Sequence, residues 1–229
     1  MKAIILAAGM GTRLGTLIPK PLSPLVDERT ILDYQVQHLS EEVGIDNIFV
    51  VIGYKKEIIM ERFPNLTYVY NEAYATTNTA KSLLKALEKV DDDALWLNGD
   101  VYFERGVLRK LMKSPNSSCL VNTLACSDEE IKYTLNRDGY IHELSKSVSC
   151  GLGEAVGINL IRRDDLRIFR EELRNVQGDD YFERALENLT LSDRVRLRPV
   201  ELGTEFCKEI DFETDLQEVI SYIRQTQPD

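Results

Sequence analysis

Short hydrophobic segments that alternate with amphipathic ones constrain the fold of this chain most strongly. Between the hydrophobic segments, hydrophobic residues recur at helical spacing in residues 31–43 and 80–87. Four segments are expected to be buried β-strands, because nearly all their side chains are hydrophobic: residues 2–6, 47–53, 67–70 and 94–97. Strands covered on both faces and separated by helices are typical of an α/β domain with right-handed crossovers. The first half therefore predicts a mixed, mostly parallel sheet flanked by helices.

The second half of the chain has shorter and more polar strands. Asp138 and Gly139 form a good turn between two of them, so we expect an antiparallel hairpin there. The elements expected in this half are strands at residues 119–125, 132–136, 140–144, 154–161 and 195–200 and helices at residues 164–174, 179–189 and 213–224. No linker rich in Pro, Gly and Ser divides the chain, so we expect one domain, 1–229, with halves of about 1–115 and 116–229.

Composition excludes several classes of protein. Hydrophobic residues make up 43% of the chain, which excludes intrinsic disorder. The net charge is 28 − 38 = −10, which disfavours nucleic acid and anionic membranes as partners. The longest hydrophobic runs are far shorter than the ~20 residues of a membrane-spanning helix. Four irregularly spaced cysteines and no visible signal peptide predict a cytoplasmic protein without a zinc site or disulfides.

A glycine-rich loop follows the first predicted strand and indicates phosphate binding. Glycine lacks the Cβ that would keep backbone N–H groups away from phosphate oxygens, and Gly9 and Gly11 lie in this loop. Arg13 and Lys20 supply the positive charge that an acidic protein needs to hold a polyphosphate. The loop matches neither a Walker A motif nor the dinucleotide fingerprint, since Thr16 and Leu14 stand at required positions. A distinct nucleotide-binding loop is therefore predicted.

The loop resembles the signature G-x-G-[ST]-R-L…P-K of the sugar-phosphate nucleotidyltransferase-like family. The resemblance continues through residues 32–35 and 49–54 to the C-terminal helix, so it covers nearly the whole chain. It implies a Rossmann-like fold with a small, partly antiparallel acceptor-binding portion, and transfer of a nucleoside monophosphate from an NTP with release of pyrophosphate. Within the family, the chain is most similar to compact, CTP-dependent cytidylyltransferases of the phosphocholine and phosphonate type.

Two carboxylates resemble the magnesium ligands of that family. Asp100 follows a predicted strand, at the sheet edge where α/β proteins bind their ligands. Asp211 comes much later, just before the last predicted helix. Mg²⁺ prefers carboxylate and phosphate oxygens, so a Mg²⁺ cofactor is expected here. The alternative role of Asp100 is the tip of a turn, and that of Asp211 is a helix N-cap, in which Thr214 or Asp215 could share. The family resemblance favours the metal for both aspartates.

The resemblance also implies which residues hold the nucleotide. Arg13 and Lys20 are expected to be catalytic. The expected nucleotide-binding residues are Leu6, Ala8, Gly9, Gly11, Thr12, Arg13, Lys20, Thr77, Asn78, Ser82 and Gly99. Helix capping is an alternative role for the polar residues of the 71–82 loop.

The acceptor site is expected to involve Lys146, Glu154, Gly157, Tyr181 and Phe182. Tyr181 and Phe182 match one wall of the aromatic cage that binds a quaternary ammonium group. The tryptophan that a phosphocholine enzyme carries near residues 131–133 is missing. We therefore favour 2-hydroxyethylphosphonate or 2-aminoethylphosphonate as acceptor, with phosphocholine next.

Two alternative functions remain open at this point. One is a sugar-1-phosphate nucleotidyltransferase that uses UTP or dTTP, and the other is a nucleotide-sensing binding module without chemistry. CTP and a small phosphorylated or phosphonate acceptor are the expected partners. A homodimer or a fused partner domain is compatible with the sequence.

Overall fold

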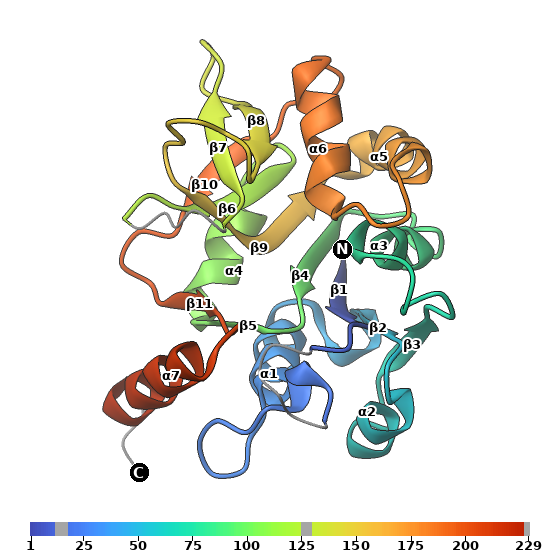
Figure 1. The fold of residues 1–229 in the computed structure, drawn as a ribbon, viewed down its shortest axis with the longest axis vertical. Helices are drawn as coiled ribbons and strands as arrows, with labels where there is room; N and C mark the ends of the chain where they lie inside the picture. The colour runs from blue at the N-terminus through green and yellow to red at the C-terminus, as the bar shows by residue number, and fades with distance from the viewer. Residues whose placement is uncertain (12–17, 125–129, 227–229) are drawn as a thin grey trace.

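The computed structural model describes residues 1–11, 18–124 and 130–226. Its larger sheet has the order β10-β6-β9-β4-β1-β2-β3; β7 also pairs with β9, and β8 pairs with β7 (Figure 1). The strands are β1 (Lys2–Ala7), β2 (Ile48–Ile52), β3 (Thr67–Tyr70), β4 (Ala94–Asn98), β6 (Ser118–Asn122), β7 (Lys132–Leu135), β8 (Ile141–Ser145), β9 (Glu154–Ile161) and β10 (Arg198–Glu201). Strands β1 to β4 run parallel to one another, whereas β9 runs antiparallel to β4 and β6. This arrangement confirms the predicted mixed, mostly parallel sheet.

Helices cover both faces of the sheet. The helices are α1 (Ile31–Val43), α2 (Lys56–Arg62), α3 (Thr79–Leu87), α4 (Arg105–Met112), α5 (Arg163–Asn175), α6 (Phe182–Leu191) and α7 (Glu213–Thr226). Ile4 packs in one buried cluster with residues of α3, α5 and α6. Ile5, the next residue along β1, packs in another with residues of α1, α2 and α4. Because successive strand residues point to opposite faces, an uninterrupted hydrophobic strand such as β1 needs both layers.

A small second sheet joins the C-terminal segment to the rest of the molecule. β5 (Val101–Phe103) pairs antiparallel with β11 (Cys207–Glu209). Beside it, Tyr34, Tyr102 and Ile210 form a third buried cluster with Val219 and Ile223 of α7. The pairing brings residues near 210 next to the end of β4, where Asp100 lies. This placement assembles the site described below.

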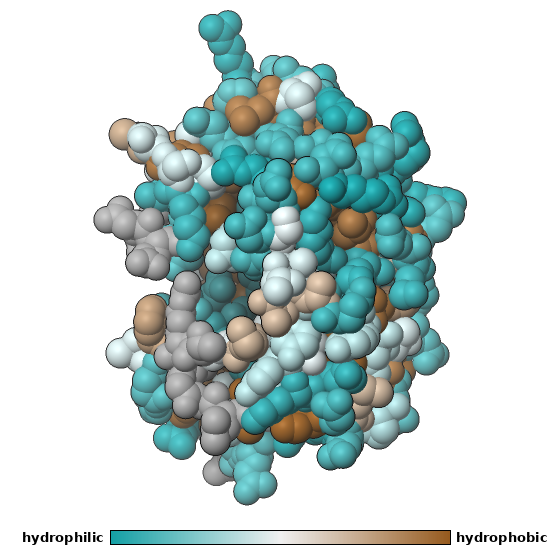
Figure 2. All heavy atoms as spheres, turned by 45° about the vertical axis from the view of Figure 1, so that its right-hand side comes forward, coloured by the Kyte–Doolittle hydropathy of each residue, from teal (hydrophilic) through white to brown (hydrophobic). Residues whose placement is uncertain are grey.

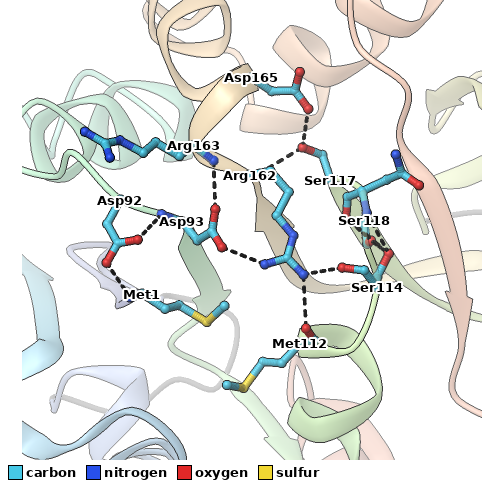
Figure 3. A network of polar contacts seen from close by, with 11 residues as sticks. Met1, Asp92, Asp93, Met112, Ser114, Ser117, Ser118, Arg162, Arg163 and Asp165 are labelled. Atoms are coloured by element: carbon cyan, nitrogen blue, oxygen red, sulfur yellow. Dashed lines mark hydrogen bonds and ion pairs between the residues drawn. The ribbon is translucent and has the colours of Figure 1, made fainter.

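The end of the sheet opposite Asp100 is held by Arg162, which follows β9 (Figure 3). Its guanidinium pairs with Asp93 at 2.6 Å and donates to the carbonyl of Met112 at 3.0 Å and to that of Ser114. These contacts join the start of β4, the end of β9 and the end of α4. The sheet is therefore anchored at one end and carries its polar site at the other.

Some short elements differ from the sequence-based prediction. The sequence analysis does not predict the strands β5 and β11 or the helices α2 and α4. A strand of three residues is too short to show a hydrophobic period. The strand expected at residues 195–200 begins at Arg198, and the helix expected at residues 179–189 begins at Phe182. Strands of both expected halves share the larger sheet, and the division into a nucleotide half and an acceptor half stays a prediction.

The surface agrees with the acidic, polar composition. Figure 2 shows a mostly hydrophilic face with small, scattered hydrophobic groups and a hollow near its middle. Within the described ranges, no helix combines the length and the hydrophobicity needed to cross a bilayer.

Candidate active site

Lys20 lies at the centre of the site. Its Nζ donates to Asp100 Oδ2 at 2.7 Å and to Asp211 Oδ1 at 2.6 Å, and the residue is only 7% exposed. Lys20 begins a short 3₁₀ turn, Lys20–Leu22, with Pro19 before it and Pro21 inside it, so the backbone that presents it is stiff. Burial disfavours the charged form, but the two carboxylates outweigh burial and raise the pKa of Lys20. Lys20 is therefore positively charged and is held in one position.

Asp100 and Asp211 are brought together by backbone pairing. The Gly99 amide donates to the Leu6 carbonyl at 3.0 Å, and the Ile210 amide donates to the Asp100 carbonyl at 2.9 Å. The side chain of Asp211 contacts Lys20, whereas Asp215 accepts from the amides of residues 211 and 212 at 3.0 and 2.8 Å. Asp215 thus caps the start of α7 and leaves Asp211 facing the site.

Glu209 completes a carboxylate cluster that the sequence analysis missed. Oxygens of Asp100, Glu209 and Asp211 lie within 4.8 Å of one another, and Asp100 Oδ1 is buried without a hydrogen-bond partner among the described residues. Burial and then the charges of Asp100 and Asp211 raise the pKa of Glu209 well above its ordinary value. Clustered carboxylates of this kind fit a hard divalent cation such as Mg²⁺. The sequence signal that could have identified Glu209 is its spacing from Asp211, because residues two apart in an extended segment lie on the same side.

Gly11 of the first loop leaves room for the side chain of Lys20. Gly11 has φ of +57°, and a Cβ there would lie 2.7 Å from Lys20 Cβ. At Gly99, a Cβ would lie 2.8 Å from the Leu6 carbonyl oxygen, whereas at Gly9 it would meet nothing within 4 Å. Leu6 and Ala8 are largely buried, at 8% and 5% exposure. Thr12 and Arg13, both expected to bind the nucleotide, lie outside the described residues.

The polar loop before α3 is organised by Asn71, a fully buried residue that the sequence analysis did not single out. Its Nδ2 donates to Ser82 Oγ at 2.9 Å and to Thr77 Oγ1 at 3.2 Å, and its Oδ1 accepts from the Ala73 amide at 3.1 Å. Asn78 is the N-cap of α3, where its Oδ1 accepts from the Thr79 amide at 2.8 Å. The three expected base-binding residues thus shape the loop, and their contact with a nucleotide stays a prediction.

A cavity of about 480 Å³ adjoins the carboxylate cluster. Four of the five expected acceptor residues line it, namely Lys146, Glu154, Gly157 and Tyr181, together with Glu209 and Asp211. Gly157 has φ of +72°, and a Cβ there would lie 2.8 Å from Asn98 Nδ2, so glycine is required both by the backbone and by the space. These four expected acceptor residues therefore share one cavity with Glu209 and with Asp211, which binds Lys20.

Phe182 does not belong to this cavity. Its side chain is fully buried and packs edge-on against Trp96, with ring centroids 5.5 Å apart. As the first residue of α6, it points into the core, while Tyr181 before it is 44% exposed and lines the cavity. Two adjacent aromatic residues thus face different environments, and we omit Phe182 from the acceptor site.

Known proteins resemble this chain in sequence and in fold. The CMP-5'-(3-aminopropyl)phosphonate synthase of Streptomyces rubellomurinus is 36% identical over 129 residues, which are 52% of this chain and 20% of that protein. The choline-phosphate cytidylyltransferase of Streptococcus pneumoniae is 35% identical over 115 residues, 48% of each chain. The matched part thus spans half or less of these curated relatives.

The fold matches solved structures over nearly its full length. The CTP:phosphocholine cytidylyltransferase from Streptococcus pneumoniae superposes with a TM-score of 0.78 at 22% identity, over 97% of this chain and 98% of that chain. The family model of the MobA-like NTP transferase domain matches residues 3–190. The expected membership is confirmed: this chain belongs to the MobA-like NTP transferase domain family.

Proposed function

We propose that the protein transfers CMP from CTP to a small phosphonate or phospho-alcohol and releases pyrophosphate. The observation that carries the proposal is the position of Lys20, held between Asp100 and Asp211 beside a cavity of about 480 Å³. A buried cation at the junction of a phosphate-binding loop and an acceptor pocket suits a reaction in which two anionic groups must meet.

The reaction forms one phosphorus–oxygen bond and breaks another. An ionised acceptor oxygen attacks the α-phosphorus of CTP, the bond to the β-phosphate breaks, and the electron pair leaves with pyrophosphate. No general base is needed, because the attacking oxygen already lacks its proton. The contribution of the protein is therefore positioning and charge neutralisation.

Each group in the site has a role in this proposal. Backbone amides near Gly9 and Gly11, with Arg13, hold the β- and γ-phosphates, and Lys20 bridges the α-phosphate and the incoming oxygen. Lys146 holds the anionic group of the acceptor. Asp100, Asp211 and the additional Glu209 would hold Mg²⁺, which neutralises charge on the phosphates when bound.

The nature of the relatives supports a CTP-dependent reaction. Two of them carry names that describe CMP or cytidylyl transfer, one to an aminoalkylphosphonate and one to phosphocholine. 2-Hydroxyethylphosphonate and 2-aminoethylphosphonate remain the favoured acceptors, with phosphocholine next. A sugar-1-phosphate with UTP or dTTP is the competing outcome.

Pyrophosphate release with Mg²⁺ tests the proposal. Each of CTP, UTP, dTTP, ATP and GTP is offered with each favoured acceptor and with several sugar-1-phosphates. We expect release with CTP and a phosphonate or phosphocholine, and a loss of roughly 10²–10³-fold in Lys20→Ala. Release only with a sugar-1-phosphate, or near-normal turnover in Lys20→Ala, would contradict the proposal.

A further inference from the structure

Another buried carboxylate, Glu183, lines the same cavity and does not belong to the cluster of Asp100, Glu209 and Asp211. It sits in the first turn of α6 and is only 7% exposed. Its Oε2 is buried and has no hydrogen-bond partner among the described residues. Glu183 lines both the cavity of about 480 Å³ and an adjoining cavity of about 220 Å³, in each case with Tyr181 and Lys146. A buried carboxylate oxygen without a donor is costly, so a ligand that donates to it would be favoured.

The charge balance of the cavity favours a cation on that ligand. Among the described residues that line the larger cavity, carboxylates outnumber lysines by seven to two. One of the two lysines, Lys208, is already engaged by Asp215 and Glu218, at 3.4 and 3.1 Å. Lys146 lies with its Nζ 5.7 Å from the centre of the Tyr181 ring. The cavity therefore has one lysine available for an anion and an excess of negative charge around it.

We propose that Glu183 binds a primary ammonium group on the acceptor, with the Tyr181 ring beside it. This inference rests on the proposed function and narrows its acceptor class to a zwitterion that carries a phosphonate or phosphate at one end and an NH₃⁺ at the other. The phosphonate end binds near Lys20 and Lys146, and the ammonium end donates to Glu183 Oε2.

The three favoured acceptors differ in what their terminal group offers to Glu183. A primary ammonium supplies both an N–H donor and a positive charge to Glu183. A hydroxyl supplies a donor without the charge, and a quaternary ammonium supplies the charge without a donor. Phe206 and Phe212 line the larger cavity, but Tyr181 is the one aromatic residue among the described residues that line both cavities with Glu183. One ring beside Glu183 is far from the closed aromatic cage that a quaternary ammonium favours. 2-Aminoethylphosphonate is thus expected to be preferred over both 2-hydroxyethylphosphonate and phosphocholine.

The competing role for Glu183 is structural. Lys146 is close enough for its charge to act on Glu183. In this structural role, Glu183 would orient Lys146 toward the anionic group that all the acceptors share. The loss of Glu183 would then lower kcat/KM equally for every acceptor. The two roles differ in one measurable quantity, the ratio of kcat/KM for an amino acceptor to that for a hydroxyl acceptor.

The experiment compares wild type with Glu183→Gln, and uses Glu187→Gln as the matched control. Glu187 lies one helical turn further along α6 and is also buried, but both of its oxygens already have partners, the Leu144 amide at 3.1 Å and Arg184 at 2.6 Å. In wild type we expect 2-aminoethylphosphonate to exceed 2-hydroxyethylphosphonate by at least tenfold in kcat/KM. Glu183→Gln is expected to reduce this ratio at least tenfold through the KM of the amine, whereas Glu187→Gln keeps it.

The possible failures are distinguishable. No pyrophosphate release from wild type with CTP and any acceptor overturns the proposed function. Release with an unchanged ratio in Glu183→Gln, or an equal loss with both acceptors, overturns the ammonium site alone. Calorimetric titration of wild type and Glu183→Gln with 2-aminoethylphosphonate tests the site without turnover. Equal affinity of the two proteins would also overturn it.

Discussion

The position of Lys20 depends on its close contact with Gly11. Lys20 approaches so close to Gly11 that a Cβ on residue 11 would lie 2.7 Å from Lys20 Cβ. The positive φ of Gly11 adds a second reason for glycine, because side chains disfavour the left-handed region. The glycine of this loop therefore positions the lysine, in addition to any contact of its amide with phosphate.

Gly11→Ala is expected to lower the free energy of unfolding by about 1–3 kcal/mol, because it combines backbone strain with a clash. Gly9→Ala is the control, since nothing lies within 4 Å of a Cβ at residue 9. Urea denaturation of the two variants measures the difference. Equal stability of both variants would show that Lys20 is not packed against residue 11.

Glu183 makes stability depend on pH. Burial raises the pKa of Glu183 from 4.5 to about 7, although its own backbone amide and Lys146 act in the opposite direction. The folded protein therefore keeps a proton that the unfolded chain loses, so stability falls as the pH rises from 4.5 to 7. The full effect is on the order of 3 kcal/mol.

Glu183→Gln removes this ionisation, so the variant should gain stability relative to wild type as the pH rises through that window. Thermal unfolding of both proteins from pH 4.5 to pH 8 measures the difference, in which all other titrating groups cancel. A difference in Tm that does not change with pH would contradict the raised pKa.

At the scale of elements, the loop between β3 and α3 depends on one buried amide. Asn71 contacts Ser82, Thr77 and Ala73, and so fixes the start of α3 relative to the end of β3. The residues that are proposed to approach the base lie on this loop. Its shape is therefore set by a side chain that the nucleotide need not touch.

Asn71→Ala is expected to lower the free energy of unfolding by about 1–3 kcal/mol, since it removes these hydrogen bonds from a buried position. It should also raise the KM for CTP more than it lowers kcat. Thr76→Ala, which removes one exposed hydrogen bond from the same loop, is the control. Steady-state kinetics and urea denaturation distinguish the two variants, and an unchanged KM in Asn71→Ala would contradict a role of the loop in nucleotide binding.

The sequence predicts the long elements well, because these depend on local patterns. The hydrophobic runs place β1 to β4, and the loop signature singles out Lys20, which the structure brings to Asp100 and Asp211. Glu209 was missed because its role depends on the pairing of β11 with β5, a contact over more than 100 residues between two three-residue strands. Phe182 was assigned to the cavity because sequence spacing does not tell which of two adjacent aromatic residues enters the core.

At the scale of the whole molecule, the site joins segments that are distant in the chain. Lys20 comes from the first loop, Asp100 from the end of β4, and Asp211 from the segment between β11 and α7. Three carboxylates held together repel one another, and Lys20 alone offsets only part of this repulsion. A bound divalent cation would therefore stabilise the whole fold through the site.

Mg²⁺ at millimolar concentration is expected to raise the Tm of wild type by a few degrees, and a chelator should reverse the shift. Asp211→Asn should lose most of the increase because it removes one of the three carboxylates. Differential scanning calorimetry with and without Mg²⁺ measures the effect. An equal Mg²⁺ shift in wild type and Asp211→Asn would place the cation elsewhere.

The proposed transfer of CMP is tested most directly by the identity of the product. Purified protein is incubated with CTP, Mg²⁺ and 2-aminoethylphosphonate, and the mixture is analysed by mass spectrometry and phosphorus NMR. We predict a CMP ester of the phosphonate in a one-to-one ratio with pyrophosphate, and its absence with Lys20→Ala. Intact CTP with every phosphonate and phospho-alcohol offered, or a nucleotide sugar formed only from UTP or dTTP, would contradict the proposal.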